Sequence, residues 1–187
     1  MKILGDERLA TSDWLEMIQR RYENRLGKPS TWYFASRTGK RAAVLVVPLT
    51  EQTGKVVLVR QYRVVLDAWV LEFPAGLVDD GEGLETAARR ELVEETGYEG
   101  EIVSIGPPVP TSPGMTDELV SIVTMRVGEA PARPAAPEAS EEIEVLALSM
   151  EELGTMIGGA ATASPRLVID SRLYAWWLGR MYSGSNA

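Results

Sequence analysis

The sequence contains neither cysteine nor histidine. Without cysteine the chain can form no disulfide, and it offers no thiolate as a nucleophile or as a zinc ligand. Without histidine it lacks the side chain that most often serves as general base and as metal ligand. Any acid–base chemistry in this protein must therefore fall to carboxylate, lysine, tyrosine or metal-bound water.

Long apolar runs and a surplus of positive charge are also missing. No apolar run approaches ~20 residues, so the sequence predicts no transmembrane helix. The N-terminus lacks the hydrophobic core of a signal peptide. Because 27 acidic residues outnumber 19 basic ones, the formal net charge is −8, which argues against broad nucleic-acid binding through a basic face. We expect a cytoplasmic protein that neither enters a membrane nor binds nucleic acid.

The pattern of apolar residues and turn signals predicts an α+β fold. At 187 residues the chain is long enough for one domain with a proper core. Because predicted strands alternate with only a few helices, a sandwich of helices on a sheet is the natural architecture. The predicted strands cover residues 32–36, 42–49, 56–62, 69–73, 101–106, 119–127 and 143–148. The predicted helices cover residues 12–26, 84–96, 150–157 and 165–182, and residues 107–117 form a loop.

One stretch, from Gly76 to Tyr98, carries a highly specific pattern. It reads G-x5-E-x7-R-E-U-x-E-E-x-G-U, where U is bulky and apolar, and the fixed positions are Gly76, Glu82, Arg90, Glu91, Leu92, Glu94, Glu95 and Gly97. At typical residue frequencies this pattern arises by chance in fewer than about one in a million chains of this length.

The second half of the pattern predicts a helix that carries a carboxylate cluster. Residues 84–96 are rich in helix formers, and Gly97 stands where a left-handed C-cap is usual. A helix places Glu91 and Glu95 on one face, with Glu94 close to it. Clustered carboxylates repel one another unless a cation lies among them, and oxygen ligands suit Mg²⁺ or Mn²⁺. The alternative is a solvated acidic helix paired with neighbouring arginines, but the full spacing favours the metal site.

On this pattern, which is the Nudix box, the chain resembles the Nudix hydrolases. The resemblance implies an α/β/α sandwich with a mixed β-sheet across about residues 41–157. It implies that Glu91 and Glu95 bind metal, that the backbone carbonyl of Ala75 adds a ligand, and that Arg90 orients a neighbouring carboxylate. We divide the chain into an N-terminal extension of helix plus strand (residues 1–40) and a Nudix domain with a C-terminal helix (residues 41–187).

Three further stretches are similar to the ADP-ribose pyrophosphatase group of the family. They are Gln61-Tyr62-Arg63 before the box, the S-P-G-x-x-D-E loop over residues 112–118, and the glutamates of residues 138–144. The resemblance implies that Arg63 reaches a substrate phosphate, that Gly76 lies at the substrate, and that Glu118 lies near the distal ribose. If the resemblance is set aside, the alternative interpretation is that Arg63 is an exposed arginine at a strand end and that Glu118 is a solvated acid in a loop.

The resemblance implies Mg²⁺-dependent hydrolysis of a nucleoside diphosphate sugar, with Mn²⁺ as an alternative metal. The expected reaction converts ADP-ribose to AMP and ribose 5-phosphate. The best match for the general base is Glu141, with Glu138, Glu142 and Glu94 as rivals, and Glu94 is alternatively a metal ligand. Two other functions remain open, a pyrophosphatase for another nucleotide sugar such as GDP-mannose and a non-catalytic nucleotide-binding module. The intact metal pattern argues against the second.

The N-terminal extension predicts a homodimer, because the group commonly dimerises through such a segment. Four aromatic residues in it are available for burial: Trp14, Trp32, Tyr33 and Phe34. Aromatic side chains are typical of interface cores. We expect the extension to help complete the substrate pocket, although Trp32 and Tyr33 in a strand fit core or interface roles better than adenine stacking.

Overall fold

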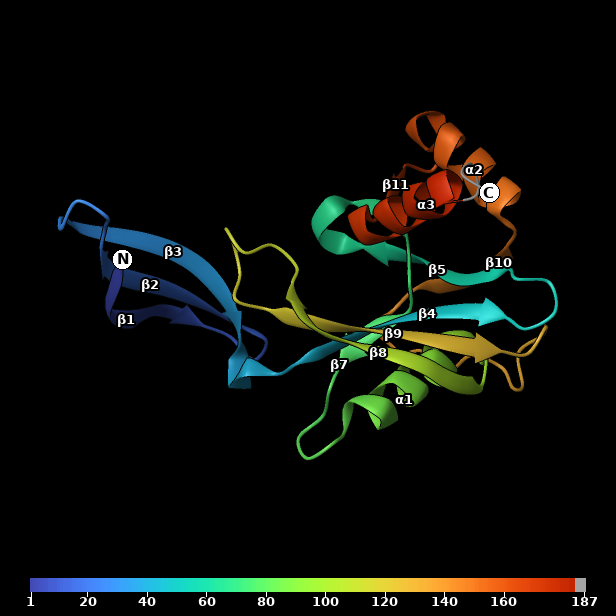
Figure 1. Ribbon diagram of the computed structural model, residues 1–187, viewed down its shortest axis with the longest axis horizontal. Coiled ribbons are helices and arrows are strands. Elements are labelled where there is room, and N and C mark those ends of the chain that lie inside the picture. Colours follow the sequence, from blue (N-terminus) through green and yellow to red (C-terminus); the bar gives the residue numbers. More distant parts are fainter. Residues whose placement is uncertain (184–187) are drawn as a thin grey trace.

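The computed structural model describes residues 1–183, apart from the side chain of Lys40. Strands β1 to β3 form a three-stranded sheet, and the remaining eight strands form the main sheet. The small sheet projects from the body of the molecule, at the left of Figure 1. None of the helices in residues 1–183 is long and apolar enough to cross a membrane.

The helix predicted over residues 12–26 is wrong, because this region forms strands. β1 (Lys2–Thr11), β2 (Leu15–Glu23) and β3 (Pro29–Arg37) pair as an antiparallel meander. Ser12 stabilises the β1–β2 turn, where its Oγ accepts the backbone N–H of Leu15 at 2.9 Å. Pairing on both edges of β2 outweighs the modest helix propensity of the segment.

The main sheet is mixed and runs in the order β11-β6-β5-β4-β9-β8, with β10 also paired to β5 and β7 to β4. The β4–β9 and β6–β11 pairs are parallel and the others are antiparallel. Its strands are β4 (Ala43–Thr50), β5 (Val56–Arg63), β6 (Ala68–Glu72), β7 (Ala75–Leu77), β8 (Gly100–Pro110), β9 (Leu119–Val127), β10 (Ile143–Leu148) and β11 (Leu167–Ile169).

Helices cover both faces of the main sheet (Figure 1). α1 (Leu84–Thr96) lies on one face, and α2 (Met150–Gly159) and α3 (Ser171–Ser183) lie on the other. Alternate residues of β4 serve the two faces. Val46 belongs to the core cluster that includes Leu92 of α1, whereas Leu45 belongs to the cluster with Leu153 of α2 and Leu173 of α3. The predicted α/β/α sandwich with a mixed sheet is therefore confirmed.

The predicted helix over residues 165–182 is only partly right. Its first residues form β11, which adds a parallel strand beside β6, and the Leu-Val-Ile sequence has high β propensity. α3 begins at Ser171 because Asp170 caps it, accepting the backbone N–H groups of Arg172 at 2.8 Å and Leu173 at 3.2 Å. β8 also continues to Pro110, into the segment predicted to be a loop.

Candidate active site

α1 presents two buried glutamates to the interior. The helix ends at Gly97, whose left-handed backbone (φ 74°) gives the expected C-cap. Glu91 and Glu95 lie four residues apart on one face and are 9% and 3% exposed, whereas the Glu94 side chain is half-exposed. The helical periodicity thus separates two interior carboxylates from one at the rim.

Strand β7 brings backbone against these two side chains. It pairs with β4, so that Ala75 lies opposite Leu45. The backbone N–H of Ala75 donates a hydrogen bond to Oε2 of Glu95 at 3.1 Å. Gly76 lies so close to the carboxylate of Glu91 that a Cβ atom would overlap it. The strand and the helix thereby gather Ala75, Gly76, Glu91 and Glu95 into one small region.

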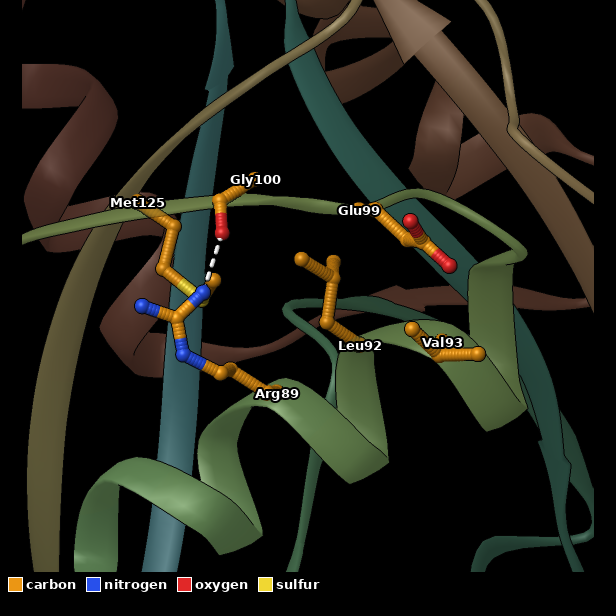
Figure 2. A pocket seen from close by; sticks show the side chains of 6 residues that line it. All are labelled: Arg89, Leu92, Val93, Glu99, Gly100 and Met125. Atoms are coloured by element: carbon orange, nitrogen blue, oxygen red, sulfur yellow. Dashed lines mark hydrogen bonds between the residues drawn. The ribbon is translucent and has the colours of Figure 1, made fainter.

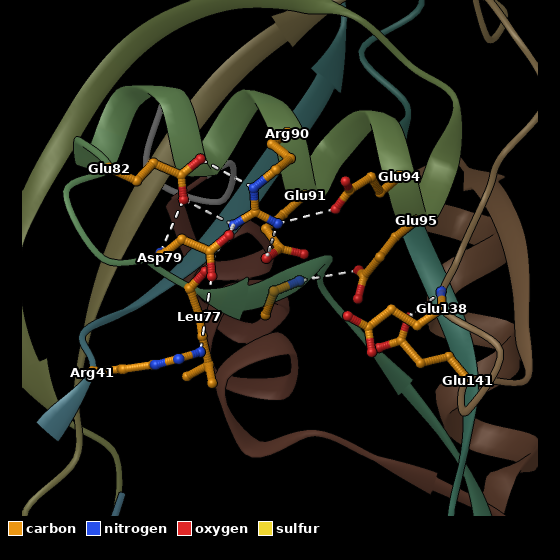
Figure 3. A network of polar contacts seen from close by, with 11 residues as sticks. Arg41, Leu77, Asp79, Glu82, Arg90, Glu91, Glu94, Glu95, Glu138 and Glu141 are labelled. Carbon is orange, nitrogen blue, oxygen red and sulfur yellow. Dashed lines mark hydrogen bonds and ion pairs between the residues drawn. The ribbon is translucent and has the colours of Figure 1, made fainter. Parts of the chain in front are cut away.

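Arg90 ties the acidic side chains of the box together (Figure 3). Its guanidinium donates to Glu82 from Nε at 3.0 Å and from Nη2 at 2.9 Å. Nη1 donates to Glu91 Oε1 at 2.8 Å and to Glu94 Oε2 at 3.0 Å. A planar guanidinium with several donors fixes the directions of the carboxylates that it binds. Arg90 is thus placed to orient its neighbours.

Burial strongly favours the neutral forms of the two interior glutamates. It raises the pKa of Glu95 to about 8, and the nearby charges of Glu141 and Glu91 act in the same direction, against the hydrogen bond from Ala75. Burial also raises the pKa of Glu91, although Arg90 opposes the shift. Carboxylates in such a position ionise readily only when a cation binds between them.

The donor set fits a hard divalent cation. Within residues 1–183 the acidic side chains, as they lie, do not form a group of three or more around one metal position. The oxygen atoms present are nevertheless those that Mg²⁺ and Mn²⁺ prefer, namely two carboxylates and a backbone carbonyl. Glu91, Glu95 and Ala75 are the residues that would hold such an ion.

A loop before β10 brings a further glutamate to the site. Figure 3 shows Glu141 and Glu95 on the same side of α1, and the charge of Glu141 contributes to the raised pKa of Glu95. Glu141 Oε2 accepts the backbone N–H of Glu138 at 3.1 Å. The carbonyl of Glu142 instead pairs with the backbone N–H of Tyr62 at 3.1 Å, in the continuation of the β5–β10 ladder. The geometry therefore brings Glu141 toward the carboxylate pair.

Arg63 and Glu118 lie in two other ion pairs. Arg63, at the end of β5, donates from Nε to Glu72 Oε1 at 2.8 Å, and burial raises the pKa of Glu72 although Arg63 opposes the shift. Glu118 accepts from Arg37 Nε at 2.8 Å, so β3 of the extension reaches the loop after β8. Arg37 was not identified from the sequence, because it belongs to no recognised motif and its partner Glu118 is distant in sequence.

Two cavities lie outside the carboxylate site. One of about 350 Å³ lies between α1 and strands β8 and β9 (Figure 2), and its lining residues are Arg89, Leu92, Val93, Glu99, Gly100 and Met125. Because neither Glu91 nor Glu95 lines it, this cavity is separate from the proposed metal-binding carboxylates. A second, of about 440 Å³, lies between the N-terminal sheet and residues 110–119.

The comparison with known proteins agrees with this geometry. Residues 39–169 match the family model described as NUDIX domain. The chain belongs to this family and is a Nudix hydrolase. Among named relatives, it is 34% identical over 194 residues to the ADP-sugar pyrophosphatase of Mus musculus, covering 98% of this chain and 88% of that protein. It is 38% identical over 127 residues to the ADP-ribose pyrophosphatase of Saccharomyces cerevisiae, covering 63% and 55%.

A solved structure described as an ADP compounds hydrolase shares the fold. The two chains superpose with a TM-score of 0.68 at 21% identity, over 99% of this chain and 95% of the other. The likeness therefore extends over the N-terminal sheet as well as the sandwich.

Proposed function

We propose that this protein hydrolyses the diphosphate bond of an ADP-sugar, and that ADP-ribose, converted to AMP and ribose 5-phosphate, is its preferred substrate. The observation that carries the proposal is the buried Glu91–Glu95 pair packed against the Ala75–Gly76 backbone. Relatives named ADP-sugar pyrophosphatase and ADP-ribose pyrophosphatase support the choice of substrate.

Glu91, Glu95 and the carbonyl of Ala75 would hold a divalent cation, Mg²⁺ or alternatively Mn²⁺. Such an ion supplies neutralisation of the diphosphate charge and a lower pKa for bound water. Arg90 keeps Glu91 pointed into the site through its 2.8 Å hydrogen bond. Glu94, half-exposed and also bound to Arg90, lies at the rim as a further ligand or base.

The remaining roles belong to Arg63, Glu141, Gly76 and Glu118. The guanidinium of Arg63 is about two-fifths exposed while its Nε is fixed by Glu72, so its other donors are available to a phosphate. Glu141 accepts the proton of the attacking water, since the chain has no histidine and the charge of this carboxylate acts on Glu95. Gly76, whose backbone lies against the Glu91 carboxylate, is at the substrate, and Glu118 contacts the sugar.

The N-terminal sheet supports a homodimer. Large apolar side chains on it remain exposed in the single chain: Ile3, Leu4, Leu9, Trp14, Leu15, Met17, Trp32 and Tyr33. Phe34, in contrast, is buried and lies under the guanidinium of Arg20. Aromatic side chains such as Trp14, Trp32 and Tyr33 are typical of protein–protein interface cores. Because Trp32 also donates from Nε1 to the carbonyl of Gly114 at 3.1 Å, the sheet reaches the proposed substrate loop.

A hydrolysis panel tests the proposed function. ADP-ribose, GDP-mannose, a dinucleoside polyphosphate and NAD are each incubated with the protein and Mg²⁺ or Mn²⁺, and the products are identified. We expect the highest kcat/KM for ADP-ribose, with AMP and ribose 5-phosphate as products. A clear preference for another compound contradicts the substrate assignment, and hydrolysis of none of them contradicts the enzymatic proposal.

A further inference from the structure

Strand β5 carries one buried polar side chain in a row of apolar ones. Alternate residues of a strand share a face, so Val57, Val59, Gln61 and Arg63 point toward the side of the sheet covered by α1. Val57 belongs to the core cluster under α1, and Val59 is fully buried. Gln61 is only 4% exposed. Its carboxamide therefore lies where the apolar row meets the charged site.

Folding alone does not account for this carboxamide. Gln61 Oε1 is buried and has no hydrogen-bond partner among residues 1–183. Nε2 has one partner, the carboxylate oxygen Oε1 of Glu141, at 3.5 Å. A buried polar atom without a partner costs folding free energy, whereas an apolar side chain in the same row does not. The amide must point its nitrogen at Glu141, because a carboxylate only accepts hydrogen bonds.

Backbone pairing holds Glu141 above Gln61. In the β5–β10 ladder Ile143 lies opposite Gln61, and the backbone N–H of Tyr62 donates to the carbonyl of Glu142 at 3.1 Å. Each oxygen of the Glu141 carboxylate then has one donor. Oε2 accepts the N–H of Glu138, within the same loop, and Oε1 accepts Gln61 from the sheet. Gln61 is thus the link between this carboxylate and the rigid core.

We infer that Gln61 is a positioning residue, whose carboxamide holds the Glu141 carboxylate against the Glu91–Glu95 pair. The inference rests on the proposed role of Glu141 in diphosphate hydrolysis. Without Gln61, the loop that carries Glu141 keeps its backbone pairing but loses the donor that fixes its carboxylate from the sheet. The substrate contacts of Arg63 and Gly76 do not change.

A double-mutant cycle tests the inference. Gln61→Leu, which keeps the size and burial of the side chain, should lower kcat for ADP-ribose by about tenfold or more, within the range expected for a misplaced general base. KM should change by less than about threefold, because the binding contacts remain. In a Glu141→Gln background the same substitution should lower kcat little further, since coupled residues are not additive. The control is Gln52→Leu, in the exposed turn between β4 and β5.

Several outcomes overturn the inference. It fails if Gln61→Leu keeps wild-type kcat, if the Gln61 and Glu141 losses multiply in the double variant, or if Glu141→Gln has wild-type kcat. A purely structural role for Gln61 predicts a lower melting temperature and losses that multiply.

A second measurement does not depend on turnover. The side-chain amide signals of Gln61 in a nitrogen-15 NMR spectrum, assigned by their absence from Gln61→Leu or from a conservative Gln61→Glu variant, should shift in Glu141→Gln. They should not shift in Glu85→Gln, which changes an exposed residue of α1. Unmoved signals in Glu141→Gln refute the contact even in a protein that hydrolyses ADP-ribose. Shifted signals in a protein that hydrolyses none of the panel uphold the contact and reject the proposed function.

Discussion

The α-carbon of Gly76 lies directly against the carboxylate of Glu91. A methyl group at this position would overlap the carboxyl carbon and both carboxyl oxygens. Glu91 cannot readily move aside, because it is buried and its Oε1 accepts from Arg90 at 2.8 Å. The glycine of the box is therefore required here by close contact between a strand and a helix.

The variant Gly76→Ala should displace Glu91 and lower kcat by more than about tenfold, a loss of ~1.4 kcal/mol or more in transition-state stabilisation. Overpacking at a buried contact should also cost about 1–3 kcal/mol of stability. Steady-state kinetics and thermal unfolding measure the two effects. Gly179→Ala, in α3 with nothing near the added methyl, is the matched control. Wild-type kcat in Gly76→Ala would show that the position of Glu91 is not critical.

The variant Glu95→Gln should nearly abolish turnover and leave the fold intact. Glutamine preserves the size of a side chain that is 3% exposed, but it removes the charge of a proposed metal ligand. At saturating Mg²⁺ we expect kcat below about a tenth of the wild-type value, equivalent to ~1.4 kcal/mol or more. Glu85→Gln, in the exposed first turn of the same helix, controls for the loss of charge. A higher residual kcat would remove Glu95 from the ligand set.

The protein should be a dimer in solution at micromolar concentration, as measured by light scattering. A monomer would refute this prediction. Deletion of residues 1–28 removes β1 and β2 and the apolar side chains that they expose. The truncated chain should be monomeric and should show a raised KM, because the deletion removes Met1, Ile3, Arg20 and Tyr22, which line the cavity beside residues 110–119. If it stays dimeric with an unchanged KM, these residues contribute neither to the dimer nor to the pocket.

Asp170 should make stability depend on pH in the acid range. Burial opposes ionisation of Asp170, but the hydrogen bonds and charge of Arg172 and the backbone N–H of Leu173 outweigh it and hold the pKa below its usual 3.8. The ionised form therefore stabilises the fold at pH values above 3.8, and this contribution is lost as the pH falls through the lower, folded-state pKa.

The corresponding variant is Asp170→Ala, which should cost about 1–2 kcal/mol at neutral pH through loss of the helix cap. The difference from the wild type, measured by urea unfolding at a series of pH values, should shrink below pH 3.8. Asp80→Ala, in an exposed loop, should show neither effect. A difference that stays constant through the acid range would contradict the assigned ionisation.

The sequence predicted the sandwich well because its signals are local. Residues 42–49 form a continuous apolar run, and they became β4, whose two faces are both covered by helices. The N-terminal extension was mispredicted because Trp14, Leu15, Ile18 and Tyr22 have helical spacing. Their strand conformation comes from pairing with β1 and β3, which no single segment reveals.

In the candidate site, too, the residues within one regular element were predicted from the sequence, whereas contacts between distant elements were not. The box placed Glu91 and Glu95 on one helical face, because both positions lie in one regular element. The pairs Arg63–Glu72 and Arg37–Glu118 depend on strand neighbours and on the packing of the extension. Likewise, the choice among the loop glutamates depended on the register of β10 against β5. The proximity of Glu141 to Glu95 supports its role as base, which stays a prediction.

One outer layer of the sandwich is formed by α2 and α3, which lie at the C-terminal end of the chain. Leu153 and Leu173, from α2 and α3, complete the core cluster that covers β4, β5 and β6, and β11 adds the strand beside β6. During synthesis from the N-terminus, the sheet and α1 leave the ribosome with this face still uncovered. Domains generally fold as units, and transiently exposed apolar surface promotes aggregation. Between the emergence of β6 and that of α3, the nascent chain therefore exposes this apolar face.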